Sequence, residues 1–259
     1  MVKKILSIAA WCITGAALVL LFIVGRKWYL DTPLKGVVFQ LDRHDTKGFV
    51  ERDTIVAYAE AISGLHQQAS IASVNLMKIK ELLADNPWIE SSSASIGLND
   101  TLIIKAKEHS PVLRVFNQEG QSVYVTAEGA VIPSGPNYTP RLIIANGNYH
   151  FPTHLDKACL SDTLYAASGL NETLAIALAL RKDPFLEGNI GQIYRNQNNE
   201  YELMVNSLPA RVVIGDTHAV ENKLARLHTL MENFSGTAEL LGYKTLDLRY
   251  KNQIVCTKK

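Results

Sequence analysis

Two histidines, His150 and His154, have a spacing at which one face of a helix could hold a metal ion between two ring nitrogens. Pro152 lies between them, and a proline in a helix interior removes a hydrogen-bond donor and clashes with the preceding turn. We therefore expect both histidines to lie in a surface loop, and we predict no metal site.

A run of three serines, Ser91 to Ser93, offers hydroxyl groups for nucleophilic chemistry. A catalytic serine needs a histidine and an orienting acid within hydrogen-bond reach, and no motif of the sequence supplies them. The chain also lacks the G-x-S-x-G, H-E-x-x-H, S-x-x-K and phosphate-binding G-x-x-x-x-G-K-[ST] motifs. We expect no catalytic residue, no cofactor and no small-molecule substrate, so the chain is predicted not to be an enzyme.

The three cysteines, Cys12, Cys159 and Cys256, are far apart and form no C-x-x-C pair. This spacing excludes zinc ribbons and thioredoxin-like redox motifs. Cys159 and Cys256 could form a disulfide if both lay outside the cytosol. Nothing in their spacing selects that pair, so free thiols are the favoured interpretation.

The composition is that of a globular protein without a nucleic-acid partner. A length of 259 residues allows about two ordinary domains. Apolar residues make up 47% of the chain and charged residues 20%, values that a disordered chain does not reach together. The net charge is +1 and no run of lysine and arginine exceeds two residues, so the basic footprint of a nucleic-acid binder is absent.

The N-terminal segment has the length and composition of a membrane span. Ile5 to Val24 contains no charged residue, and about 20 helical residues cross a bilayer core. Lys3-Lys4 and Arg26-Lys27 flank it, and Trp28-Tyr29 stands where aromatic belts occur. A cleaved signal peptide is the alternative, but the apolar run is too long and no A-x-A site follows. We predict an uncleaved anchor, whose flanking charges do not decide its orientation.

Hydrophobic periodicity divides the remaining chain into two regions. The first is predicted to contain a strand at 37–41, a helix at 51–63 closed by Gly64, a helix capped by Ser73 that ends before Pro87, and a hairpin turning at Asn99-Asp100. The second is predicted to be mainly β. Its strands are expected at 112–116, 121–126, 141–145, 191–195, 201–205 and 211–214, with helices at 172–181 and 218–234.

The last residues, 244-KTLDLRYKNQIVCTKK-259, alternate apolar and charged side chains. This pattern predicts one long strand, or a strand broken by a turn at Lys251-Asn252. Leu246 and Leu248 would face the core. A final strand is often an edge strand, which natural proteins protect against unwanted pairing.

Three stretches together resemble the bacterial FtsQ/DivIB family of cell-division proteins. They are 86-NPWIESSSASIGLNDTLIIKAKEHSPVLRV-115, 124-YVTAEGAVIPSGPNYTPRL-142 and the tail LDLRYKNQIVC. The resemblance implies an α+β fold in which a single transmembrane helix precedes a POTRA domain, of order strand–helix–helix–strand–strand, and a mainly antiparallel β domain. The implied boundaries are a cytoplasmic tail at 1–4, a transmembrane helix at 5–25, a linker at 26–35, the POTRA domain at 36–109, the β domain at 110–256 and a tail at 257–259. The cytoplasmic tail is shorter than in the family, and no extension follows the last strand.

The same resemblance implies a non-enzymatic scaffold of the divisome in the inner membrane. Its N-terminus would be cytoplasmic, and the bulk of the chain would lie in the periplasm at the division septum. The β domain would hold FtsB- and FtsL-like partners by strand addition and so help bring septal peptidoglycan synthases to the site. Carried over residue by residue, the partner-binding positions are Arg249, Tyr250, Lys251, Asn252 and Gln253.

Two other functions are compatible with the residues. A POTRA-bearing module of outer-membrane assembly or secretion would carry tandem POTRA units or a following barrel, whereas the sequence predicts one unit. An anchored periplasmic hydrolase would need a catalytic site that no motif indicates.

Overall fold

The computed structural model describes residues 2–259 except 44–45, 64–69, 136–137, 154–156 and 235–238, with side chains from Ala9 onward. The chain folds into two compact units, Met1–Arg43 with Val50–Glu108, and His44–Phe49 with His109–Lys259. The predicted α+β class is confirmed, because helices accompany two separate sheets, the larger of which is mostly antiparallel.

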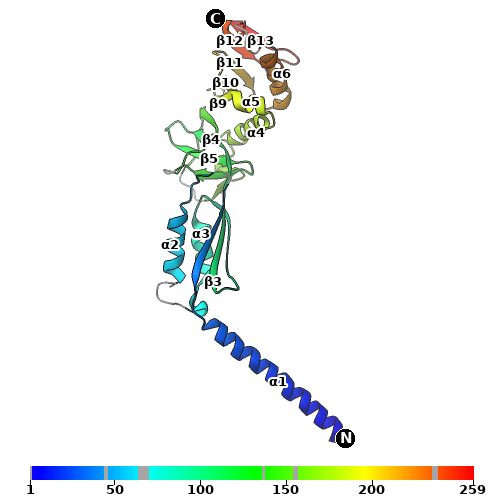
Figure 1. Cartoon of the computed structure of the whole chain (residues 1–259). Helices are drawn as coiled ribbons and strands as arrows, with labels where there is room; N and C mark the ends of the chain where they lie inside the picture. Colours follow the sequence, from blue (N-terminus) through cyan, green and yellow to red (C-terminus); the bar gives the residue numbers. More distant parts are fainter. Residues whose placement is uncertain (1, 44–45, 64–69, 136–137, 154–156, 235–238) are drawn as a thin grey trace. The chain divides into compact units, whose positions relative to one another are not determined.

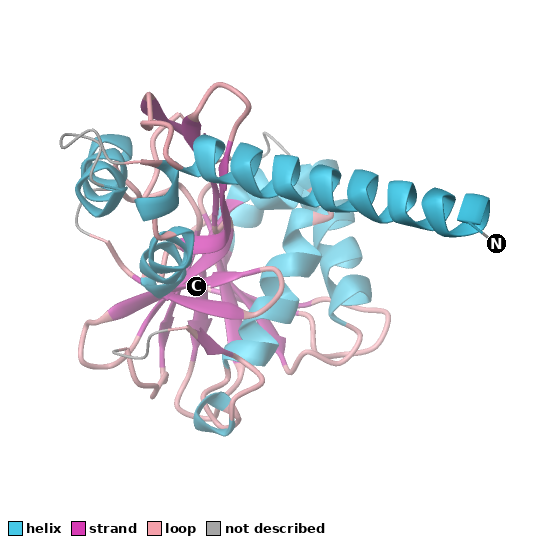
Figure 2. Ribbon diagram, turned by 90° about the horizontal axis from the view of Figure 1, so that it is seen from below, coloured by secondary structure: helices cyan, strands magenta, loops and turns pink. Residues whose placement is uncertain are grey.

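Helix α1 (Val2–Leu30) is the candidate membrane span, and Figure 2 shows it as one continuous helix. Its segment Ala9–Leu30 has 22 residues, a mean hydropathy of 1.9 and no buried side chains. By length and composition, α1 alone among the described helices could cross a membrane, which agrees with the predicted single N-terminal membrane helix. The helix continues past the flanking basic residues Arg26-Lys27 to Leu30.

The first unit contains a three-stranded sheet of order β1-β3-β2, with β1 at Gly36–Asp42, β2 at Ile89–Ile96 and β3 at Thr101–Glu108. Strand β1 pairs with β3 in parallel, and β2 with β3 antiparallel. Helices α2 (Arg52–Ser63) and α3 (Leu76–Asp85) lie between β1 and β2 in the sequence and pack on the sheet. This is the strand–helix–helix–strand–strand order that periodicity predicted. Its core includes the fully buried residues Leu83, Leu102 and Ile104.

The prediction that Ser73 caps the N-terminus of α3 is wrong, because a short 3-10 helix precedes α3. Ser73 ends a 3-10 helix, η2 (Ile71–Ser73), and the cap of α3 is Asn75, whose side chain accepts a hydrogen bond from the Lys78 amide at 2.9 Å. Serine and asparagine are equally good caps, so propensity could not choose between them. The predicted cap of α2, Gly64, lies outside the described residues.

The second unit is built on a ten-stranded sheet of order β13-β12-β11-β10-β9-β7-β4-β5-β6-β8 (Figure 1). In chain order its strands are β4 Pro111–Phe116, β5 Ser122–Thr126, β6 Ala130–Pro133, β7 Ile143–Gly147, β8 Ala158–Cys159, β9 Ile190–Arg195, β10 Tyr201–Val205, β11 Arg211–Gly215, β12 Tyr243–Asp247 and β13 Val255–Lys258. Most pairings are antiparallel, but β4–β7, β7–β9 and β11–β12 are parallel.

Three helices, α4 (Leu170–Arg181), α5 (Pro184–Asn189) and α6 (Val220–Asn233), contact one another beside this sheet. Two single-turn 3-10 helices, η3 (Thr163–Tyr165) and η4 (Glu239–Gly242), complete the unit. The sequence did not predict β6, β8 or α5, because strands of four and two residues and a helix of six are too short to show their period. Cys159 and Cys256 lie on the two end strands of the sheet and are free thiols, as is Cys12.

Gly147 makes the parallel pairing of β7 with β9 sterically allowed. Its φ is +112°, and a Cβ at this position would lie 2.1 Å from the carbonyl oxygen of Arg195. That oxygen also accepts a hydrogen bond from the Asn148 amide at 2.8 Å, so it cannot move away without breaking the junction. The middle of the sheet therefore requires glycine here.

We predict that Gly147→Ala lowers the free energy of unfolding by about 3 kcal/mol or more, since it adds a backbone clash to an unfavourable φ. The matched control is Gly120→Ala, whose φ is +78° but whose Cβ would meet nothing within 4 Å. That variant should lose only about 1–2 kcal/mol. Denaturant unfolding of both variants measures the difference, and equal losses would contradict the role assigned to Gly147.

Candidate docking edge

The predicted partner-binding residues lie in the connection between β12 and β13. The prediction of one uninterrupted strand is wrong, because β12 ends at Asp247 and β13 begins at Val255. The turn at Lys251-Asn252 is present, and Asn252 has a φ of +58°. Leu246 and Leu248 are fully buried, as their alternation indicated. Residues 249–253 therefore form an exposed turn that leads into the last strand.

Strand β13 is an edge strand with one side open. It pairs antiparallel with β12, and within the described residues it has no other strand neighbour. Its side chains alternate, with Cys256 packed toward the core and Val255 and Thr257 exposed. At the opposite end of the sheet, β8 has only two residues. Strand β13 is thus the longer of the two open edges in this unit, and it can accept a further strand.

Arg226 of α6 holds the turn through main-chain oxygens. Its Nη1 donates to the carbonyl oxygens of Tyr250 at 2.7 Å and Gln253 at 2.6 Å, and its Nη2 donates to that of Leu248 at 2.8 Å. These three carbonyls lie outside the described strands. A guanidinium is suited to this contact, because its donors form a planar fork that remains charged at every physiological pH.

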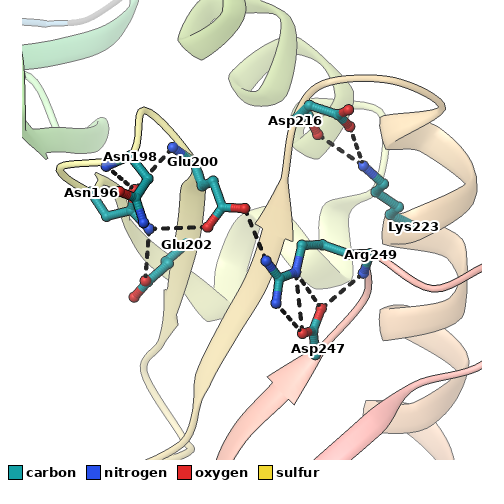
Figure 3. Close-up of polar contacts among 8 residues, drawn as sticks. All are labelled: Asn196, Asn198, Glu200, Glu202, Asp216, Lys223, Asp247 and Arg249. Carbon is teal, nitrogen blue, oxygen red and sulfur yellow. Dashed lines mark hydrogen bonds and ion pairs between the residues drawn. The ribbon is translucent and has the colours of Figure 1, made fainter.

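Arg249 points back onto the sheet (Figure 3). Its guanidinium is 2.7 Å from one oxygen of Asp247 and 2.9 Å from one of Glu200, in the β9–β10 turn. Its stem lies over Gly215, where a Cβ would come within 2.8 Å of the Arg249 side chain. The hydrogen bonds from Arg249 lower the pKa of Asp247, and the carboxylates raise the pKa of Arg249. Arg249 therefore joins the turn to the sheet.

The other four predicted residues face solvent. Tyr250 is 47% exposed, and Lys251, Asn252 and Gln253 are also exposed. Further exposed lysines lie on the same hairpin, at Lys244, Lys258 and Lys259. Asp247 is the acidic residue of this hairpin, and Arg249 neutralises it. The edge is therefore basic, with Tyr250 and Val255 as its exposed apolar groups.

Sequence reasoning missed Arg226 and Glu200. The apolar stripe of α6 faces the core, since Leu224, Leu227 and Met231 are buried. Arg226 lies between them in sequence but gave no signal, because its partners are backbone carbonyls rather than a motif of acidic side chains.

The other candidate groups remain apart. His150 is exposed in a loop, and His154 lies outside the described residues. No cluster of three metal-binding side chains occurs in the part of the chain that the structure describes. Ser91 to Ser93 lie on β2, where they pair with Lys107, Ala106 and Lys105 of β3.

Comparison with known proteins gives two matches. Residues 110–257 match the family model described as "FtsQ/DivIB, C-terminal related". The cell division protein FtsQ of Cellvibrio japonicus (strain Ueda107) is 31% identical over 100 residues. That alignment covers 37% of this chain and 29% of the relative, so it spans less than a third of the relative's length.

We predict that Arg226→Met frees the turn while α6 keeps its apolar packing. The variant leaves three carbonyls without a charged donor, which should cost about 1–3 kcal/mol in the free energy of unfolding. Amide hydrogen exchange should become faster in residues 249–258 in particular. Arg181→Met is the control, since the interaction of Arg181 with the described residues is an exposed 3.6 Å ion pair with Glu187. Unchanged exchange in the turn would contradict the role of Arg226.

We also predict an acid-dependent loss of the Asp247–Arg249 contact. The pKa of Asp247 is lowered below its ordinary 3.8, so its stabilising effect is complete above that value and is lost as the pH falls through the folded-state pKa. Asp247→Asn should lower the free energy of unfolding by about 1 kcal/mol near neutral pH. This difference should shrink below about pH 4. Denaturant unfolding over a pH series measures it, and a difference that persists at low pH would count against the contact.

Proposed function

Because this chain belongs to the FtsQ/DivIB family of cell-division proteins, we propose that it is a divisome scaffold whose β13 edge accepts a strand from a membrane-anchored partner. The partners are FtsB- and FtsL-like proteins, through which the scaffold helps recruit or regulate the septal peptidoglycan synthases. Family membership supports the role in cell division. The docking site rests on the open side of β13.

The edge has the properties that strand addition needs. Main-chain hydrogen bonds supply affinity in this mode, and the outward side chains supply specificity. The fixed turn reduces the conformational entropy lost on binding, because Arg226 already orders residues 248–253. The exposed lysines fit a partner strand flanked by acidic side chains, and opposite charges of this kind steer association.

The proposed topology places the N-terminus in the cytoplasm and both compact units in the periplasm at the septum. The single candidate membrane helix supports a one-span anchor. The scaffold itself carries no catalytic group in this proposal. The residues proposed to line the partner are Tyr250, Lys251, Asn252 and Gln253, with Arg249 holding their turn in place.

We predict that Val255→Glu and Tyr250→Ala each weaken co-purification of the FtsB-like partner by at least about tenfold, a loss of roughly 1.4 kcal/mol or more. Val255→Glu places a charge on the exposed face of the edge. Val38→Glu on β1 is a matched control, because Val38 and Val255 are both 42% exposed. Proline at Asn252 is unsuitable, since it cannot adopt a φ of +58° and would break the turn itself.

Loss of co-purification in the Val38 variant alone would move the docking site to the first unit. Unchanged co-purification in all three variants would exclude the β13 edge while leaving family membership intact.

Depletion of the protein in cells tests the role itself. The proposal predicts filamentous cells with unfinished septa, and re-expression of the intact chain should restore division. A POTRA-bearing assembly module would instead give normal septa with an outer-membrane defect. An anchored hydrolase would show turnover of cell-wall or peptide substrates by the purified chain.

A further inference from the structure

Among the described residues outside α1, the turn between β2 and β3 carries the most exposed large apolar side chain. Leu98 is 102% exposed, compared with 65% for Met77, the next in this group. The turn itself is well ordered, because the Gly97 amide donates to the Thr101 carbonyl at 2.8 Å and the Asp100 amide to the Gly97 carbonyl at 3.1 Å. Leu98 therefore packs on no described part of this unit.

This turn is fastened to the segment that leaves α1. The Lys35 amide donates to the Asp100 carbonyl at 2.8 Å, and Lys35 Nζ forms an ion pair with Asp100 at 2.8 Å. A second tie joins Thr32 to η2, since its carbonyl accepts from the Ile71 amide at 2.9 Å. The turn therefore cannot move away from residues 32–35 without breaking these bonds.

The connection between membrane helix and turn is short. Lys35 is five positions beyond Leu30 in the chain, and five residue steps span at most about 18 Å when fully extended. It is not fully extended, because the Asp31 and Thr32 amides still donate to carbonyls of Lys27 and Tyr29. The uncharged stretch Ile5–Val24 is about 30 Å long at 1.5 Å per residue, close to the thickness of a bilayer core. Arg26-Lys27 therefore lie at one membrane boundary when α1 spans, with Leu30 about one helical turn beyond them.

We infer that the β2–β3 turn rests on the phospholipid surface, with Leu98 inserted at the boundary between headgroups and acyl chains. The groups around it suit that position. Trp28 and Tyr29 are exposed aromatic residues at the end of α1, where aromatic side chains occupy the interface. The acidic group of the turn, Asp100, is neutralised by Lys35, whose own side chain is 67% exposed.

This contact gives the first unit a second point of attachment beside α1. One covalent tether leaves a domain free to tilt, whereas a tether with an inserted side chain restricts its orientation. The inference depends only on α1 crossing a bilayer and not on the docking function of β13.

The test uses the full chain in phospholipid nanodiscs, with Cys12, Cys159 and Cys256 replaced by serine and one introduced cysteine carrying an environment-sensitive fluorophore. Leu98→Cys is compared with Lys105→Cys, an exposed position four residues beyond Thr101 on β3. Quenching by lipids with a nitroxide near the headgroup should be several-fold stronger at 98 than at 105. Equal quenching at the two positions, or quenching at neither, would overturn the inference.

A second pair of variants tests Leu98 itself. The fluorophore is placed at Asn99→Cys, with residue 98 either leucine or changed by Leu98→Glu. The charge should reduce quenching at 99 several-fold, while the circular dichroism spectrum stays the same. Quenching that is indifferent to Leu98→Glu would show that the turn is near the membrane without inserting, which contradicts the inference.

Discussion

The contact between the Arg226 guanidinium and three carbonyl oxygens determines how the end strand of the larger sheet is presented. Residues 248–254 lie between two strands and have few ladder partners, so their backbone needs another source of order. One side chain from α6 supplies it, at distances of 2.6–2.8 Å. Charge-assisted hydrogen bonds are stronger than neutral ones, and here a single group makes three of them. The position of β13 follows from this contact and from its pairing with β12.

Helix α6 has two roles that depend on the same placement. It forms the connection between β11 and β12, which pair in parallel and therefore need a long crossover. Its buried residues Leu224, Leu227 and Met231 fix it on the core, and this leaves Arg226 directed at the turn. The packing of α6 on the core therefore also sets the geometry of the β13 edge.

Much of this architecture could be predicted from the sequence, and the failures have physical reasons. The strands and helices of the first unit could be predicted because apolar residues recur with a period of 2 in its strands and 3.6 in its helices. These residues are buried, as Leu102, Ile104 and Leu83 show. The start of α3 failed because Ser73 and Asn75 are both good caps. The tail alternates on either side of Lys251-Asn252, so the sequence left both an unbroken strand and a turn open. The structure has the turn, where Asn252 adopts a positive φ. Arg226 was missed because its acceptors are backbone carbonyl oxygens, which every residue carries. No particular side chain in residues 248–253 therefore indicates the contact. The predicted positions 249–253 remain a prediction as a binding site.

The open side of β13 offers peptide groups, which every amino acid supplies except for the amide of proline. Most single substitutions in such a strand therefore leave its hydrogen-bonding groups unchanged. Changes in its outward side chains would alter which strand the edge selects, and not its capacity to pair. The positions under strict constraint would instead be remote from the seam, at residues such as Arg226 and Gly215 that no partner strand needs to touch.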